Sequence, residues 1–129
     1  MKKQFVVAVE PMGKPRMTQR DMWKQRPAVM RYRAYCDVIR AAAGFADKVT
    51  VRGPVRLIVT AYFTMPRSWS ERERAKLGGT AHTQKPDADN ILKGVADALF
   101  ENDEMVYTQY VVKWWDYGSV PRLEIILDM

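Results

Sequence analysis

The clearest alternation of apolar and polar positions in the chain runs from Val55 to Phe63. Every second residue of this stretch is apolar, and a more polar set lies between them. A period of two is typical of a β-strand that turns one face toward a core. Gly53-Pro54 predicts a turn before this strand, and Pro66 ends it.

Three further stretches predict strands because they are rich in β-branched and aromatic residues. They run from Gln4 to Val9, from Met105 to Trp115 and from Arg122 to Leu127. The turn residues Tyr117-Gly118-Ser119 separate the last two stretches and predict a β-hairpin there.

Helical spacing of apolar residues predicts two longer helices, one from Ala28 to Ala46 and one from about Asp89 to Phe100. Between them, Ser70 and Glu73 form a capping-box pattern that opens a short charged helix ending near Leu77. The segment from Thr18 to Pro27 is irregular and is expected to be a long loop.

This order of elements is strand, helix, strand, short helix, helix, strand, strand. It predicts an α+β fold in which helices pack on a small mixed or antiparallel sheet. The 129 residues fit a single domain spanning 1–129 with a modest core, and 47% of them are hydrophobic, as in globular chains. The apolar runs are too short to cross a bilayer, so no membrane association is expected.

The formal net charge is +6, which favours an anionic partner, with nucleic acid ahead of membrane. Basic residues gather in one segment in which Asp21 is the only acid: Lys14, Arg16, Arg20, Lys24, Arg26, Arg31 and Arg33. A solvated loop would also explain this segment. The single cysteine cannot form an intrachain disulfide, which suits the cytoplasm, and the single histidine excludes a Cys/His zinc site.

An acidic centre follows the short helix. Asp87 and Asp89, separated by one residue, stand where the last long helix begins, and Lys93 follows Asp89 by one helical turn. Clustered carboxylates with an ammonium nearby suit Mg²⁺-assisted phosphoryl chemistry. The alternative is that the aspartates cap the helix and that Asp89 and Lys93 form a surface ion pair. Asp97, a further turn along, either orients Lys93 or is a solvated helix residue.

Several segments together form a recognisable motif pattern: Gly13-Lys14-Pro15-Arg16, Met65-Pro66-Arg67-Ser68-Trp69-Ser70, His82-Thr83, Lys85-Pro86-Asp87-Ala88-Asp89-Asn90, Leu92-Lys93, Asp97-Ala98-Leu99 and Asn102-Asp103. In these segments the chain resembles the RusA family of Holliday junction resolvases, in its phage and prophage branch. The resemblance covers most of the chain, and its central block is far more specific than an isolated D-x-D.

The resemblance implies that Asp87, Asp89 and Asp103 bind a divalent metal and that Lys93 is essential for cleavage. The family usually has two aspartates in a row where this chain has Asn102-Asp103, and a one-residue shift would give the third ligand role to Glu104. The expected cofactor is Mg²⁺, with Mn²⁺ as a substitute. The expected DNA contacts are Lys14, Arg16, Arg20, Lys85 and Lys93.

The resemblance further implies a homodimer that nicks a four-way DNA junction symmetrically by metal-dependent hydrolysis of the phosphodiester. Two other classes of protein fit parts of the sequence. A non-enzymatic phage DNA-binding protein explains the basic segment but not the acids, which would repel DNA without a metal. A flap- or fork-selective metal nuclease would carry the same residues.

Overall fold

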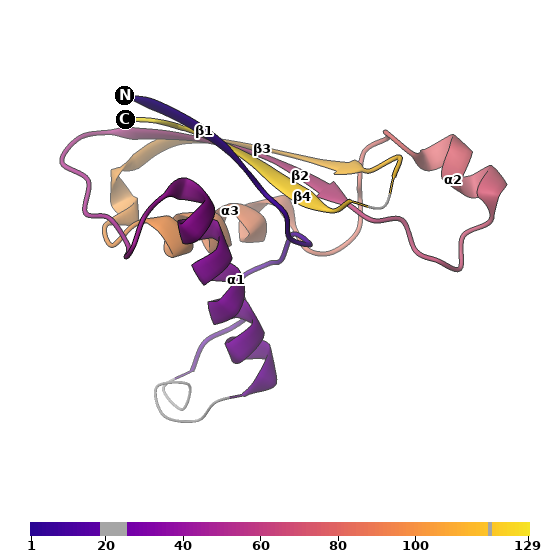
Figure 1. Ribbon diagram of the computed structural model, residues 1–129, viewed down its shortest axis with the longest axis horizontal. Helices are drawn as coiled ribbons and strands as arrows, with labels where there is room; N and C mark the ends of the chain where they lie inside the picture. The colour runs from indigo at the N-terminus through magenta and orange to yellow at the C-terminus, as the bar shows by residue number, and fades with distance from the viewer. Residues whose placement is uncertain (19–25, 119) are drawn as a thin grey trace.

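The protein is described here from a computed structural model, which covers residues 1–18, 26–118 and 120–129. Its centre is a four-stranded mixed sheet with the strand order β1-β4-β2-β3 (Figure 1). The strands are β1 (Lys2–Val7), β2 (Val55–Phe63), β3 (Val106–Trp115) and β4 (Arg122–Asp128). β4 is antiparallel to both β1 and β2, whereas β3 runs parallel to β2. The predicted α+β fold with a mixed sheet is confirmed.

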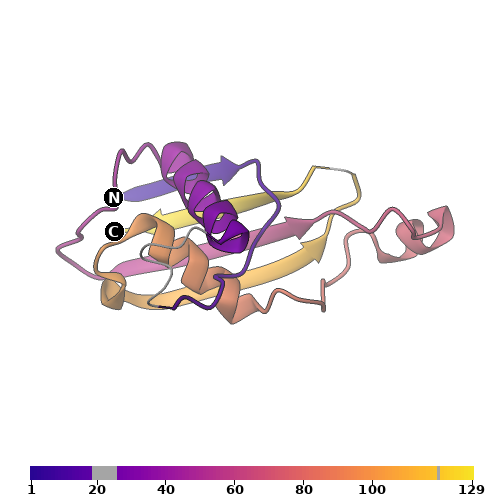
Figure 2. The same cartoon turned by 90° about the horizontal axis from the view of Figure 1, so that it is seen from below.

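Two helices cover one face of this sheet, and the opposite face carries no helix within the described ranges (Figures 1 and 2). They are α1 (Pro27–Ala43) and α3 (Ala88–Leu99). The short helix α2 (Glu71–Leu77) projects beyond the end of β2, and a 3-10 turn, η2 (Asp103–Met105), leads from α3 into β3. None of the helices in the described part of the chain is long and apolar enough to span a membrane.

The core lies between the sheet and the two long helices. Alternate residues of β2 are buried, as the period of two predicts. The fully buried positions of the sheet face the apolar stripes of α1 and α3. The largest of these side chains are Tyr32, Ile39, Leu57, Ile91, Leu99, Phe100, Leu123, Ile125 and Leu127.

The predicted hairpin between the last two strands is wrong. β3 and β4 follow each other in sequence, but β2 lies between them in the sheet. The register pairs Tyr62 of β2 with Trp114 on one side and with Arg122 on the other. The segment after β3 therefore crosses the end of β2 instead of making a tight turn. Of the predicted turn residues, Tyr117 and Gly118 are described, whereas Ser119 lies outside the described residues.

Element boundaries differ from the predicted ones by a few residues. The first strand ends at Val7, because Val9 has already turned back to donate a backbone hydrogen bond to the Val7 carbonyl. The first helix ends at Ala43, where Gly44 adopts the left-handed conformation that glycine tolerates best. The capping box is confirmed, since the Ser70 hydroxyl accepts a hydrogen bond from the Glu73 amide at 3.2 Å.

Adjacent isoleucines of β4 give a test of this arrangement. Ile125 is completely buried on the helix side, whereas Ile126 is half-buried on the open side. We expect Ile125→Ala to lower the free energy of unfolding by about 2–5 kcal/mol, through lost burial and a cavity. Ile126→Ala should cost clearly less. Urea denaturation of both variants measures the difference, and equal losses would contradict the assignment of the two faces.

Candidate nucleic-acid and metal site

The two predicted metal ligands stand together at the amino end of α3. Asp87 occupies the position before the first helical residue, but its side chain makes no capping hydrogen bond. Its carboxylate instead pairs with the Lys85 ammonium at 3.2 Å. One residue into the helix, the Asp89 carboxylate pairs with Lys93 at 3.2 Å. All four side chains are exposed, and the positive end of the helix dipole favours acids here.

The segment before these acids is held by Lys113, which the sequence analysis did not single out. The Lys113 ammonium donates hydrogen bonds to the carbonyl oxygens of Gln84 at 2.7 Å and Pro86 at 2.8 Å. Burial lowers the pKa of Lys113, and the nearby Asp87 carboxylate opposes that shift. The available signal is that Lys113 is the only charged residue between Val106 and Trp115.

The N-terminal segment is fastened to the same helix by Asn90. The Asn90 side-chain amide donates to the Lys14 carbonyl at 3.1 Å, and the Lys14 amide donates to the Asn90 carbonyl at 3.4 Å. Gly13 allows this close approach, since a Cβ there would lie 2.4 Å from the Asn90 amide nitrogen. Asn90 of the D-A-D-N motif therefore positions the start of the basic segment against α3.

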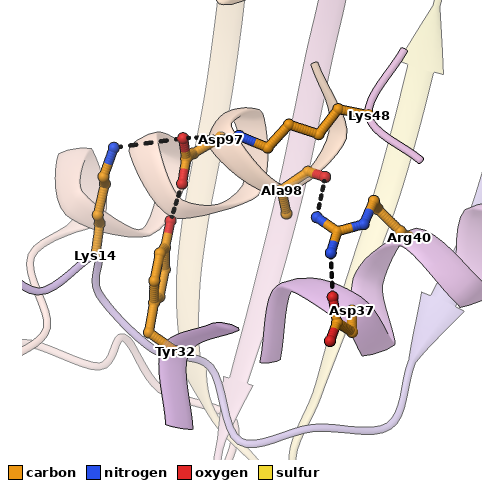
Figure 3. A network of polar contacts seen from close by, with 7 residues as sticks. All are labelled: Lys14, Tyr32, Asp37, Arg40, Lys48, Asp97 and Ala98. Carbon is orange, nitrogen blue, oxygen red and sulfur yellow. Dashed lines mark hydrogen bonds and ion pairs between the residues drawn. The ribbon is translucent and has the colours of Figure 1, made fainter. Parts of the chain in front are cut away.

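Asp97 is the centre of a polar network that joins α3 to three other parts of the chain (Figure 3). Its carboxylate accepts a hydrogen bond from the Tyr32 hydroxyl of α1 at 2.7 Å. It also pairs with the ammonium groups of Lys14 and Lys48, each at 3.4 Å. The idea that Asp97 orients Lys93 is wrong, and so is its alternative as a solvated residue, because Asp97 faces α1 while Lys93 pairs with Asp89.

The electrostatics of this network favour the charged form of Asp97. Burial by itself would raise the pKa of Asp97, but the Tyr32 hydrogen bond and the two lysines outweigh it, so the pKa is lowered. Burial raises the pKa of Tyr32, and the hydrogen bond to Asp97 adds to that rise. The tyrosine thus stays a neutral donor and the aspartate a charged acceptor at neutral pH.

The third predicted ligand, Asp103, does not join the other two. It begins η2, beyond the carboxyl end of α3, whereas Asp87 and Asp89 stand at its amino end. A helix of this length separates them by about 18 Å. Glu104 lies beside Asp103 in the same turn, so assigning the third ligand role to Glu104 would leave that ligand equally distant from Asp87 and Asp89. Across the described residues, no group of three Asp, Glu, His or Cys side chains is placed to hold one metal ion.

The residues predicted to contact DNA differ in the solvent exposure of their side chains. Lys85 and Lys93 are exposed beside the acids, and Arg16 is exposed on the N-terminal segment. The Lys14 ammonium is half-buried on Asp97. Arg20 lies outside the described residues, so its role stays a prediction.

His82 takes no part in this surface. It is 4% exposed, and its ring stacks on Phe63 with ring centres 3.8 Å apart and lies 4.3 Å from Trp115. Burial, followed by the charge of Lys113, lowers its pKa to about 4, so it is neutral at physiological pH.

The protein is thus an α+β domain with acids and lysines exposed at the amino end of one helix. The family model described as "Endodeoxyribonuclease RusA" matches residues 8–128, nearly the whole chain. The chain therefore belongs to the RusA family of endodeoxyribonucleases, which act on branched DNA junctions. It is also 33% identical to the "Uncharacterized protein YqaN" of Bacillus subtilis (strain 168), over 95% of this chain and 93% of that protein.

The Asp97 network predicts a pH-dependent contribution to stability. Its lowered pKa stabilises the fold above the unfolded value of about 3.9, and this stabilisation is lost as the pH falls through the folded value. At pH 7, Asp97→Asn should cost about 1.5–3 kcal/mol, the usual worth of hydrogen bonds to a charged group. Denaturation of both proteins at pH 7 and near pH 3 measures this, and a gap that stays constant with pH would contradict it.

Proposed function

We propose that this protein resolves four-way DNA junctions by metal-dependent hydrolysis of phosphodiester bonds, acting as a homodimer that nicks symmetrically. The observation that carries the proposal is the pair of exposed carboxylates at the amino end of α3, Asp87 and Asp89, with Asp89 one helical turn from the Lys93 ammonium. In a RusA-family chain these three groups stand at matching motif positions. Family membership supports the nuclease class, and the arrangement of the site indicates which residues would carry out the cleavage.

The donor atoms fit a hard divalent cation such as Mg²⁺, with Mn²⁺ as a substitute. Asp87 and Asp89 offer carboxylate oxygens that are neither buried nor used to cap α3. Mg²⁺ bound there would supply Lewis-acid polarisation of the phosphate and acidify a water molecule. Lys93 would stabilise the charge that develops on the phosphate. Lys113 would hold the preceding segment, and with it Asp87, in place.

One chain presents only two of the three expected carboxylates at this point. Asp103 stands at the far end of α3, so we infer that it reaches the site of a second copy and not its own. A homodimer would then contain two sites, each built from Asp87 and Asp89 of one subunit and Asp103 of the other. A two-fold dimer also matches the two-fold symmetry of a four-way junction.

Phosphate contacts would come from the basic residues around the acids. Lys85 and Lys93 flank the carboxylates, and Arg16 projects from the segment that Asn90 fastens to α3. Such contacts are independent of sequence and weaken with salt. We therefore infer that the protein recognises the branched shape of the DNA. Cleavage assays on matched four-way junction, fork and flap substrates would distinguish a junction resolvase from a fork or flap nuclease.

Mixed dimers test the shared site. Asp89→Asn and Asp103→Asn should each abolish cleavage of a synthetic four-way junction in Mg²⁺ while leaving junction binding intact. After subunit exchange between the two variants, cleavage should return to roughly a quarter of the wild-type level, because half the dimers are mixed and each holds one complete site. Gel assays of nicking and of binding measure both properties.

The matched control is the mixture of Asp87→Asn with Asp89→Asn. These residues belong to the same half of the site, so no mixed dimer regains a complete one. Rescue by this pair, or none by the first pair, would contradict the shared site. Loss of binding together with cleavage in the single variants would instead identify the acids as structural.

Lys93 separates chemistry from binding. Its side chain is exposed and lies away from the apolar stripe of α3, so Lys93→Ala should change stability by no more than about 0.5 kcal/mol. As a charge-stabilising group it should matter much more, and cleavage should slow at least about a hundredfold. Lys93→Arg should restore little, because a planar guanidinium does not replace a compact ammonium. Thermal melting and single-turnover cleavage measure the two effects, and near-normal cutting by Lys93→Ala would refute the role.

A further inference from the structure

Along residues 106–112 the outer edge of β3 has an unusual composition, and no described segment pairs with it there. Residues 106–112 read Val-Tyr-Thr-Gln-Tyr-Val-Val, without charge or proline. Exposed edges are normally protected by charges, because a bare edge is a template for another strand. The other edge of the sheet, β1, has that protection in Lys2 and Lys3. β3 carries no charged side chain before Lys113.

Backbone groups on this edge point away from the sheet. The Lys113 carbonyl accepts from the His82 amide at 3.0 Å, and the Trp115 amide donates to the Thr80 carbonyl at 2.9 Å, so both face outward from β2. Strand residues alternate in direction, which gives Gln109 and Val111 the same outward orientation. No other described segment forms a backbone hydrogen bond with these two residues. Their donors and acceptors are thus available to a further strand.

Large side chains accompany this free edge. Tyr110, between Gln109 and Val111, is 66% exposed and pairs in register with Ile58 on the helix-free face. Tyr107 is 68% exposed near the start of the strand. Exposed aromatic residues on an uncharged edge are typical of a surface that binds another strand.

We propose that β3 pairs antiparallel with β3 of a second copy of this chain, with Tyr110 facing the partner's Tyr110. This inference rests on the homodimer of the proposed function and assigns its interface. In this register Gln109 of each copy exchanges both backbone hydrogen bonds with the partner's Val111. The two tyrosines then form a cross-strand pair at a position without hydrogen bonds, where side chains lie closest.

The pairing fixes where the two sites lie. Antiparallel pairing of identical strands places the two-fold axis perpendicular to the sheet, so one continuous sheet carries both α3 helices on the same face. Both acidic helix ends therefore face one substrate. Asp103 begins η2, the turn that leads into β3, and Lys113 near the end of β3 holds the segment before Asp87. Antiparallel strands thus carry Asp103 of one copy toward the Asp87 segment of the other.

A single cysteine tests the register directly. In the proposed pairing the two Cα atoms at position 110 lie about 4.5 Å apart, within the range that a disulfide requires. Tyr110→Cys should therefore give a covalent dimer on mild oxidation, visible on a non-reducing gel and reversed by reductant. The native Cys36 is buried and common to every variant.

Tyr107→Cys is the matched control, since it replaces another exposed tyrosine of the same strand. Its two copies would lie about 20 Å apart across the dyad and should stay uncrosslinked under the same conditions. Equal crosslinking of both variants, or of neither, would overturn the register.

A charge on the dyad gives an independent test. Tyr110→Arg places like charges opposite each other and should raise the dimer dissociation constant at least tenfold, measured by sedimentation. Val6→Arg, on the exposed face of β1, should leave it unchanged. A stable dimer of folded Tyr110→Arg would overturn the interface. If Tyr110→Cys crosslinks but the wild-type protein cuts no junction, the interface is supported and the proposed function is refuted.

Discussion

Burial of one face of α3 is the constraint on which the candidate site depends. Ile91, Val95 and Leu99 are completely buried against the sheet, and this fixes the rotation of the helix about its axis. Asp89 and Lys93 fall on the opposite side and must face outward. The ion pair between them contributes little to stability, as exposed pairs usually do. The chemistry of the surface is therefore held in place by apolar packing behind it.

Polar contacts hold the segments around α3 that apolar packing alone does not fix. Asn90 fastens the N-terminal segment, Lys113 fastens the segment before Asp87, and Asp97 joins α3 to Tyr32 of α1. Each of these ties reaches a part of the chain distant in sequence. They give a structural reason for two polar positions of the motif, Asn90 and Asp97, which hold neighbouring segments around the acids.

The sequence predicted those features that depend on local periodicity. Alternation identified β2, helical spacing identified α1 and α3, and the Ser70 capping box marked the start of α2. Pairing of strands is not local, and so a plausible turn suggested a hairpin where β2 intervenes between β3 and β4. The predicted helix from about Asp89 to Phe100 already implied that a helix separates Asp89 from Asp103, although the family resemblance assigned both residues to one metal site. The contacts of Lys113 are not local either, so its sequence did not predict them.

The charge arrangement around the acids suggests why lysines accompany them so closely. Lys85 neutralises Asp87 and Lys93 neutralises Asp89, so the free protein avoids the repulsion between adjacent carboxylates. If a divalent cation takes over that neutralisation, both ammonium groups lose their partners at the place where a DNA phosphate would arrive. Binding of cation and of phosphate would then reinforce each other, since each lowers the electrostatic cost of the other. The same side chains thus serve the resting protein as counter-ions and the proposed reaction as phosphate contacts.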